Sequence, residues 1–237
     1  MILVAKAAKM TDFLIRSAGP AFFFGIQYST LQTAWMISAR GSTGSIPLLP
    51  FSSLVSNCLV WTYYGSLLKD QTILIPNFAG LFVGAYCVYI FNQHNKAGNK
   101  VVERNTHIAC GSIIVISTIL YFLQKSELLG SLGVIMAIFL MYSPLSTLNQ
   151  VLKTKSTESL VFSTSAVMFM SSLSWMIYGL YVKDNMVIIP NAAGFVLCCI
   201  QMGLFVMFGF PNSTSRTSSR QSLSVSVGGS SDLDLKI

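Results

Sequence analysis

The chain has 237 residues, of which 53% are hydrophobic and only 10% are charged, and its mean hydropathy is +0.64. Soluble globular domains carry about 25% charged residues, so this composition excludes an ordinary water-soluble domain and indicates a chain that is solvated by lipid. The formal charge of +7 comes from short loops between apolar stretches, which is typical of membrane topology signals. We therefore expect a lipid bilayer, and no nucleic acid, as the partner of these basic residues.

Seven apolar stretches follow one another along the chain. Each holds about 18–26 residues, enough to span about 30 Å of hydrocarbon as a helix. The polar, serine-rich segment 211–237 predicts a disordered tail. We predict an all-α polytopic membrane protein with seven transmembrane helices, at 13–38, 47–68, 72–92, 107–124, 129–151, 162–182 and 186–209.

The loops between these stretches predict an orientation. Six basic residues follow the first, third and fifth stretches, whereas three follow the second, fourth and sixth. The positive-inside rule then puts the first set of loops and the C-terminus in the cytosol and the N-terminus outside. Lys6, Lys9 and Arg16 count against this orientation. We expect a plasma-membrane location, with an endomembrane or the vacuole as alternatives.

The sequence contains an internal repeat. Residues 28–91 align with residues 142–205 at a constant offset of 114 without a gap, and 19 of the 64 positions are identical. The identities cluster in the pattern WxxYG…KD…IPNxAG, found at residues 61–80 and again at residues 175–194. Such a match in register predicts a duplicated structural unit.

The duplication also predicts how the domains are organised. Each copy holds three stretches, an odd number, so two directly fused copies would cross the membrane in opposite directions. The fourth stretch restores the same direction to both, and a cleft between two such parallel repeats is where transporters bind substrate near mid-membrane. The predicted units are a first three-helix repeat, a linker helix, a second three-helix repeat and the tail, at 1–106, 107–127, 128–210 and 211–237.

These motifs strongly resemble those of the SWEET sugar transporters, of the PQ-loop or MtN3-saliva type. The resemblance covers residues 18–210 and rests on YSPL, KTKSTE, WMIYG and IPNAAG at 142–145, 153–158, 175–179 and 189–194, with WTYYG and IPNFAG at 61–65 and 75–80. It implies two triple-helix bundles and a facilitative, bidirectional uniporter of a mono- or disaccharide that works by alternating access. It implies no cofactor and no ion coupling, and it is compatible with a homo-oligomer.

Polar residues inside the apolar stretches are the candidate substrate contacts. Asn77 and Asn191 follow prolines, and a side-chain amide offers two donors and two acceptor lone pairs to sugar hydroxyls. Matching asparagines line the sugar site in the resembled family. The alternative is that each amide caps helix carbonyls freed by the proline before it.

Two tryptophans stand 16 residues before these asparagines. The indoles of Trp61 and Trp175 offer a flat apolar face to a sugar ring and one N–H donor. The alternative is an interfacial tryptophan belt. Asn57 and Ser171 lie one helical turn earlier on the same face and are predicted as second-tier polar contacts.

The remaining candidates concern gating. The resembled family uses four prolines around its cytosolic gate, of which Pro50 and Pro144 are present, whereas Thr30 and Val161 stand at the other two positions. Pro76 and Pro190 are predicted to kink their helices. The extracellular gate, or simply close packing through glycine, is predicted at Tyr64, Gly65, Tyr178 and Gly179.

Two further expectations come from flanking residues. Asp70 and Asp184, each next to a lysine, are expected to be solvated loop ends. The phenylalanine run at 22–24 is expected to face lipid or the core. The alternative is that Phe23 and Ile26 narrow the cavity, with Met136 and Phe139 as their approximate partners in the second half.

Other functions need residues that the sequence lacks. A proton-coupled amino-acid or small-metabolite transporter of the wider PQ-loop group would carry Pro-Gln and an intramembrane acid, whereas this chain has Ser143-Pro144-Leu145 and no such acid. An enzyme needs a nucleophile–base or metal constellation, and the sequence offers none, so we expect neither catalysis nor a metal. A non-transporting membrane receptor stays open as an alternative.

Overall fold

The computed structural model describes residues 2–95 and 99–210, so the predicted tail at 211–237 lies outside the described residues. All regular structure in these two ranges is helical, which confirms the all-α prediction. The elements are α1 (Ile2–Arg40), α2 (Leu49–Leu68), α3 (Gln71–His94), α4 (Lys100–Phe122), α5 (Ser126–Leu140), α6 (Tyr142–Thr154), α7 (Phe162–Val182) and α8 (Asn185–Phe208).

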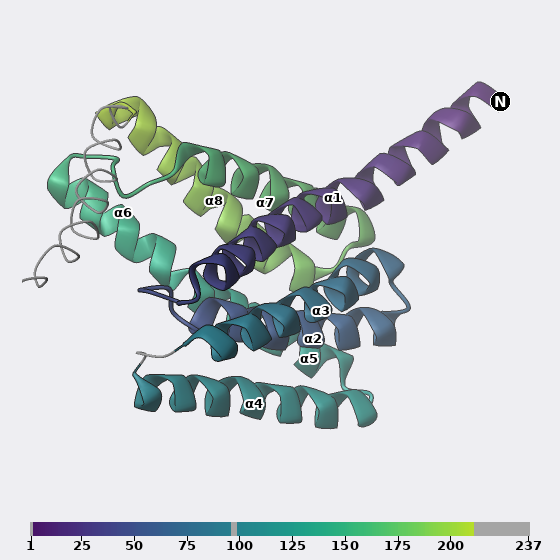
Figure 1. The fold of residues 1–237 in the computed structure, drawn as a ribbon. Coiled ribbons are helices and arrows are strands. Elements are labelled where there is room, and N and C mark those ends of the chain that lie inside the picture. Colours follow the sequence, from purple (N-terminus) through teal and green to yellow (C-terminus); the bar gives the residue numbers. More distant parts are fainter. Residues whose placement is uncertain (1, 96–98, 211–237) are drawn as a thin grey trace, which may run out of the picture.

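Three parts of the predicted helix pattern differ from the structure by more than a few residues. Helix α4 begins at Lys100 rather than at residue 107. Helix α1 begins at Ile2 rather than at residue 13, and its N-terminal part projects beyond the other helices (Figure 1). The predicted stretch 129–151 is two helices, α5 and α6, separated by Met141. Because Pro144 has no N–H, the carbonyl of Leu140 loses the donor four residues on, and the helix is interrupted there.

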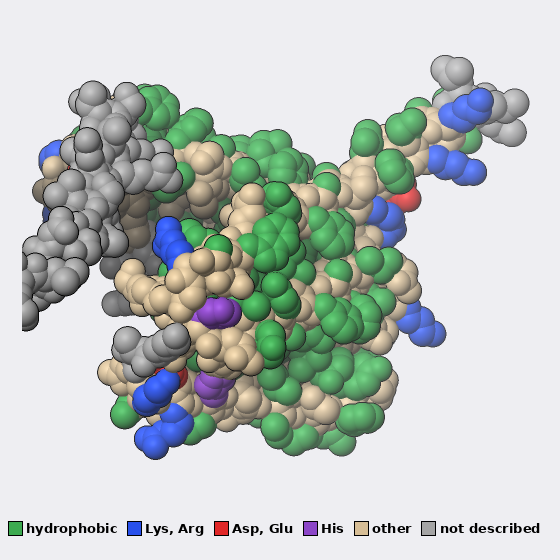
Figure 2. Space-filling model, in the orientation of Figure 1, with side chains coloured by type: hydrophobic (Ala, Val, Ile, Leu, Met, Phe, Trp, Pro, Cys, Tyr) green, Lys and Arg blue, Asp and Glu red, His purple; other side chains and the backbone are tan. Residues whose placement is uncertain are grey.

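The surface of the helical bundle suits a membrane. Helices α3, α4, α7 and α8 are long and apolar enough to span a bilayer, and α5 is a shorter apolar helix. Large apolar side chains such as Phe82, Phe139 and Val206 are 61%, 75% and 87% exposed. Apolar side chains cover the middle of the molecule, and lysines and arginines gather toward its ends (Figure 2). Contiguous apolar surface of this kind is costly in water and is favoured in lipid.

The helices pack reciprocally across the two halves of the chain. Helix α2 packs against α3, and α7 packs against α8 in the same way. Helix α1 contacts both α3 and α7, while α5 contacts both α8 and α2. Helix α4 lies at the edge, against α2 and α5 (Figure 1). Helix α1 of the first half therefore packs against the second half, and helix α5 of the second half packs against the first.

Close contacts repeat at the offset of 114 that the sequence shows. A Cβ atom placed on Gly80 in α3 would lie 2.7 Å from the Sγ atom of Cys58 in α2. A Cβ atom on Gly194 in α8 would lie 3.0 Å from the Oγ atom of Ser172 in α7. The two helical hairpins therefore pair in the same register.

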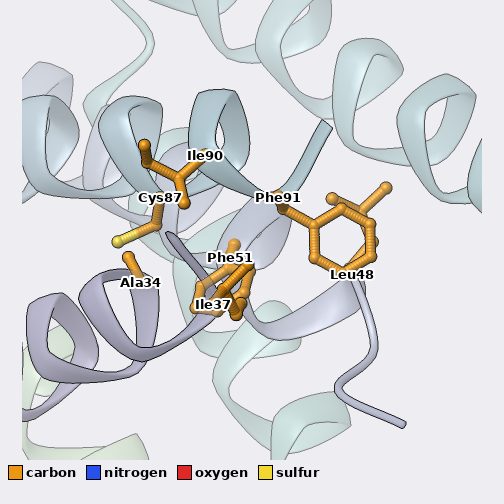
Figure 3. Close-up of a cluster of buried hydrophobic side chains, with 7 residues drawn as sticks. All are labelled: Ala34, Ile37, Leu48, Phe51, Cys87, Ile90 and Phe91. Atoms are coloured by element: carbon orange, nitrogen blue, oxygen red, sulfur yellow. The ribbon is translucent and has the colours of Figure 1, made fainter. Parts of the chain in front are cut away.

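One hydrophobic cluster fills the space between α1, α2 and α3. In Figure 3, Ala34 and Cys87 face each other from α1 and α3, beside Ile37 and Phe51. All of its core members are at most 8% exposed, namely Ala34, Ile37, Leu48, Phe51, Cys87, Ile90 and Phe91. The cluster packs the ends of α1 and α3 against the start of α2.

Candidate functional site

A cavity of about 750 Å³ lies between the two halves of the chain. Both halves line it, and none of the described side chains in its wall is an aspartate, glutamate, lysine, arginine or histidine. The structure brings all six predicted substrate contacts into this one wall, and their contact with a substrate stays a prediction. They are Asn57, Trp61 and Asn77 from the first half and Ser171, Trp175 and Asn191 from the second.

The two asparagines are held in matching ways. The Nδ2 atom of Asn77 donates to the carbonyl of Ile73, and that of Asn191 donates to the carbonyl of Val187, both at 2.8 Å. These carbonyls lie four residues before each asparagine, one position after the carbonyl that the neighbouring proline frees. One N–H and the Oδ1 atom of each amide have no partner among the described residues, so a donor and an acceptor remain for a ligand.

Each tryptophan side chain contacts a helix from the other half of the chain. A Cβ atom on Gly133 in α5 would lie 2.9 Å from the Trp61 indole, and a Cβ atom on Gly19 in α1 would lie 2.9 Å from the Trp175 indole. The two glycines are themselves 114 residues apart. Because glycine has no side chain, each indole lies flat against the facing helix and lines the cavity.

The cavity serine Ser171 differs from helical serines that bond to their own backbone. Ser131 and Ser174, for example, donate to the carbonyl four residues earlier at 2.8 Å and 2.7 Å. This backbone bond is the usual choice for serine in a helix. Within the described parts of the chain, Ser171 and Asn57 make no hydrogen bond, so their polar groups are available to a ligand.

Two tyrosine–aspartate pairs lie next to Ile73 and Val187, which line the cavity. The Tyr64 hydroxyl donates to the Asp184 carboxylate at 2.8 Å and 2.9 Å, and the Tyr178 hydroxyl donates to Asp70. Each pair joins one half of the chain to the other. Both tyrosines are buried, in a cluster with Leu129 and its neighbours.

The expectation that Asp70 and Asp184 are solvated loop ends is wrong. Each carboxylate caps a helix, since Asp70 accepts from the backbone N–H of Thr72 and Asp184 from that of Met186, both at 2.9 Å. The same carboxylates receive the tyrosine hydroxyls of the opposite half. Their binding partners are remote in sequence, so the local charge pattern does not reveal them.

The glycines beside these tyrosines allow the hairpins to pack closely. A Cβ atom on Gly65 would lie 2.9 Å from the backbone nitrogen of Leu74, and one on Gly179 would lie 3.0 Å from that of Ile188. Close packing through glycine, one of the two alternatives, is therefore present. Gating by the tyrosines stays a prediction.

The predicted prolines occupy different places. Pro50 lies in the first turn of α2 and lines the cavity. Pro144 lies in the first turn of α6, and its side chain is not among those that the structure describes. Helices α3 and α8 continue through Pro76 and Pro190, both of which are buried.

The apolar narrowing of the cavity is only partly as predicted. Phe23 and Ile26 line it, but Met136 does not, and Phe139 is 75% exposed. The second half contributes the residues one position further along, Ala137 and Leu140. These stand at the repeat offset from Phe23 and Ile26, so strict application of the offset would have found them.

Sequence reasoning also missed an ionic contact at the outer end of α1. Arg16 pairs with Asp12 at 2.8 Å, and the Tyr181 hydroxyl of α7 donates to the same carboxylate at 2.9 Å. These hydrogen bonds from Arg16 and Tyr181 hold the pKa of Asp12 below its ordinary value. The contact ties α1 to α7 beside the Tyr178–Asp70 pair.

Comparisons with known proteins agree with this architecture. A family model described as "Sugar efflux transporter for intercellular exchange" matches residues 14–97 and 127–213. The relative named "Sugar transporter SWEET1" from Xenopus laevis is 32% identical over 203 residues, covering 82% of this chain and 92% of the relative. "Bidirectional sugar transporter SWEET11" from Oryza sativa subsp. japonica is 27% identical over 207 residues, covering 84% of this chain and 67% of the relative.

A solved structure has the same fold. The 3.7 Å structure of a eukaryotic SWEET transporter matches with a TM-score of 0.68 at 22% identity, covering 83% of this chain and 95% of that chain. The matched family model covers both halves of the duplicated chain and leaves out the whole of α4, the helix between them. The chain therefore belongs to the SWEET family of sugar transporters.

Proposed function

We propose that this chain is a facilitative, bidirectional transporter of a mono- or disaccharide. The observation that carries the proposal is the uncharged cavity in which two asparagines and two tryptophans meet from equivalent positions of the two halves. The names of the relatives, which describe sugar transporters, support the same substrate class. Proteins of this family carry sugars and are not enzymes.

The chemistry of the cavity wall fits a sugar. Sugar hydroxyls need neutral donors and acceptors, which Asn77 and Asn191 offer through one N–H and one oxygen each. The apolar C–H face of a sugar ring packs against an aromatic face, which Trp61 and Trp175 supply. A wall that lacks acidic, basic and histidine side chains among its described residues favours an uncharged ligand, because it offers no counter-charge to a charged one.

The absence of acidic, basic and histidine side chains from the described wall also supports uniport. Proton-coupled carriers place such side chains within the membrane. By alternating access, the sugar-bound protein opens first to one side of the membrane and then to the other, and net flux follows the sugar gradient. Tyr64 and Tyr178, with their aspartate partners, are the proposed gate at one end of the cavity, while Pro50 lies toward the opposite end with Val161.

The proposal includes a membrane arrangement. Seven spans form two parallel three-helix repeats at 1–106 and 128–210, joined by a linker helix at 107–127, and α5 and α6 together make the fifth span. The reciprocal packing of α1 and α5 supports this arrangement. The tyrosine gate then faces outside with the N-terminus, in the plasma membrane, and the Pro50 end faces the cytosol.

The test is uptake of labelled glucose and maltose into vesicles by the Asn191→Ala variant. This variant is expected to lose sugar flux for both sugars while it still reaches the membrane. Asn185→Ala is the matched control, since Asn185 is exposed at the start of the same helix and outside the cavity wall. Wild-type flux in Asn191→Ala would refute the assignment of the site.

Trp175→Ala tests the aromatic part of the cavity wall. Removing the indole is expected to weaken sugar binding more than it lowers protein stability, because one face of the cavity loses its apolar platform. Equilibrium binding and thermal unfolding of the purified protein measure the two effects. An unchanged affinity would contradict the platform role.

A further inference from the structure

The cavity is not symmetric, although its two halves repeat. Beyond the level of the asparagines it continues along α7 and α8, where Ser165, Ser172 and Gln201 line it. The equivalent residues at the offset of 114 are Phe51, Cys58 and Cys87, which are 3%, 0% and 0% exposed and do not line the cavity. At these three positions the second half lines the cavity with polar side chains, here called the polar chamber, whereas the first half buries an aromatic ring and two thiols.

The register of the helices puts Ser165 beside Gln201. Ser172 meets Gly194 across the antiparallel pair of α7 and α8. Ser165 lies seven residues before Ser172, and Gln201 lies seven residues after Gly194. Both steps lead the same distance away from the turn that joins the helices, so the two residues share a level of the chamber.

The same construction in the first half reaches Phe51 and Cys87. Cys58 meets Gly80, and seven residues from each are Phe51 and Cys87. Figure 3 shows these two side chains inside the cluster between α1, α2 and α3. The second half therefore has a hydroxyl and an amide at the level where the first half has an aromatic ring and a thiol.

These polar groups have no partner of their own. Ser165 and Gln201 are only 5% and 8% exposed, and neither makes a hydrogen bond to any described residue. The hydroxyl of Ser174 in the same helix, by contrast, donates to the carbonyl of Met170. Both side chains line the cavity, so the polar groups of Ser165 and Gln201 are available to bond to a ligand that enters it.

The distance between the two levels indicates the size of the ligand. Gln201 follows Asn191 by ten residues, about 15 Å along α8. Its side chain leans toward the N-terminus of the helix, and so toward Asn191. A single sugar ring, built from bonds of about 1.5 Å, is too short to contact both levels at once. A second linked ring brings further hydroxyls toward Ser172 and Gln201.

We propose that Ser165 and Gln201 form a second hydroxyl-binding subsite, which holds the second ring of a disaccharide whose first ring lies between Asn77 and Asn191. This inference rests on the proposed sugar-transport function and specifies its substrate. The chain then carries disaccharides in preference to monosaccharides.

The test compares binding of maltose, sucrose and glucose to the purified full-length protein. Gln201→Met keeps the length of the side chain but removes its amide, and is expected to weaken disaccharide binding about tenfold while glucose binding changes less than twofold. Ser165→Ala, a smaller change, is expected to act in the same direction. Ser174→Ala is the matched control, because this serine bonds to the backbone and lies outside the cavity wall.

Three results would overturn the subsite. Equal weakening of glucose and disaccharide binding would mean that the variants disturb the fold or the gate. Unchanged affinities in both variants would mean that the chamber does not contact the ligand. A wild-type protein that binds glucose but neither disaccharide would contradict the subsite alone, whereas one that binds no sugar would contradict the proposed function itself.

Discussion

Tyr64→Phe tests whether the tyrosine–aspartate pairs hold the cavity closed at one end. The substitution removes a hydroxyl that donates to the Asp184 carboxylate at 2.8 Å and 2.9 Å, and it leaves the ring in place. A hydrogen bond to a charged acceptor contributes about 1.5–3 kcal/mol, and each 1.4 kcal/mol is a factor of ten. The ratio of open to closed protein should therefore rise roughly ten- to a hundredfold.

Spin labels at the tips of the two hairpins measure this ratio. Lys69 and Lys183 are exposed and occupy equivalent positions beside the gate, so Lys69→Cys and Lys183→Cys place one label on each side of it. Cys199, the exposed native cysteine, is replaced by serine to prevent labelling there. Double electron–electron resonance then measures the distance between the two labels and reports the population in which the tips are further apart. We expect this population to grow in Tyr64→Phe.

Tyr63→Phe is the control for the gate experiment. The Tyr63 hydroxyl lies 3.3 Å from that of Thr118 and the Tyr63 ring stacks on Tyr121, so it makes no bond across the gate. A distance distribution in Tyr64→Phe that matches the wild type would refute the argument. An equal change in Tyr63→Phe would also refute it, because loss of the cross-gate bond would not then be the cause.

Two further variants test the wall and the core. Gly133→Ala should lower sugar affinity about tenfold with little change in thermal stability, because the added Cβ atom would lie 2.9 Å from the Trp61 indole and displace it. Gly25→Ala, which meets open space, should leave affinity unchanged, and equal affinities in both variants would contradict the packing argument. Phe51→Ala should lower the free energy of unfolding by about 3–5 kcal/mol, since the ring is buried in the core. Phe139→Ala, which removes a 75% exposed ring, should cost much less, and similar unfolding temperatures for the two would contradict this assignment of the core.

The repeat in the sequence predicted more of this molecule than any single motif did. The offset of 114 places Trp61 and Trp175, and Asn77 and Asn191, at equivalent positions, and the structure gathers all four in one cavity wall. The reason is that helix faces are set by residue spacing, which a duplication without gaps preserves.

What the sequence did not predict depends on contacts between distant residues. Asp70 and Asp184 looked like loop charges because their tyrosine partners lie in the opposite half of the chain. The interruption at Met141 follows from the missing N–H of Pro144, a local signal that the apolar composition of the stretch conceals.

The repeat already shows a sequence difference at the polar chamber, but only the packing of the helices shows what this difference means. Ser165 and Gln201 differ in polarity from Phe51 and Cys87 at the matching positions. Sequence comparison alone does not say which of the two sets faces the cavity, because that depends on how the helices of the two halves pack together. Helix α1 covers the first set, whereas the second set lines the open cavity.

Uptake of labelled sugar by the purified protein in liposomes tests the central claim most directly. With and without an imposed proton gradient, we expect the same saturable flux down the sugar gradient and above that of protein-free liposomes. Flux that requires the proton gradient, or no flux above the protein-free control, would contradict an uncoupled sugar carrier.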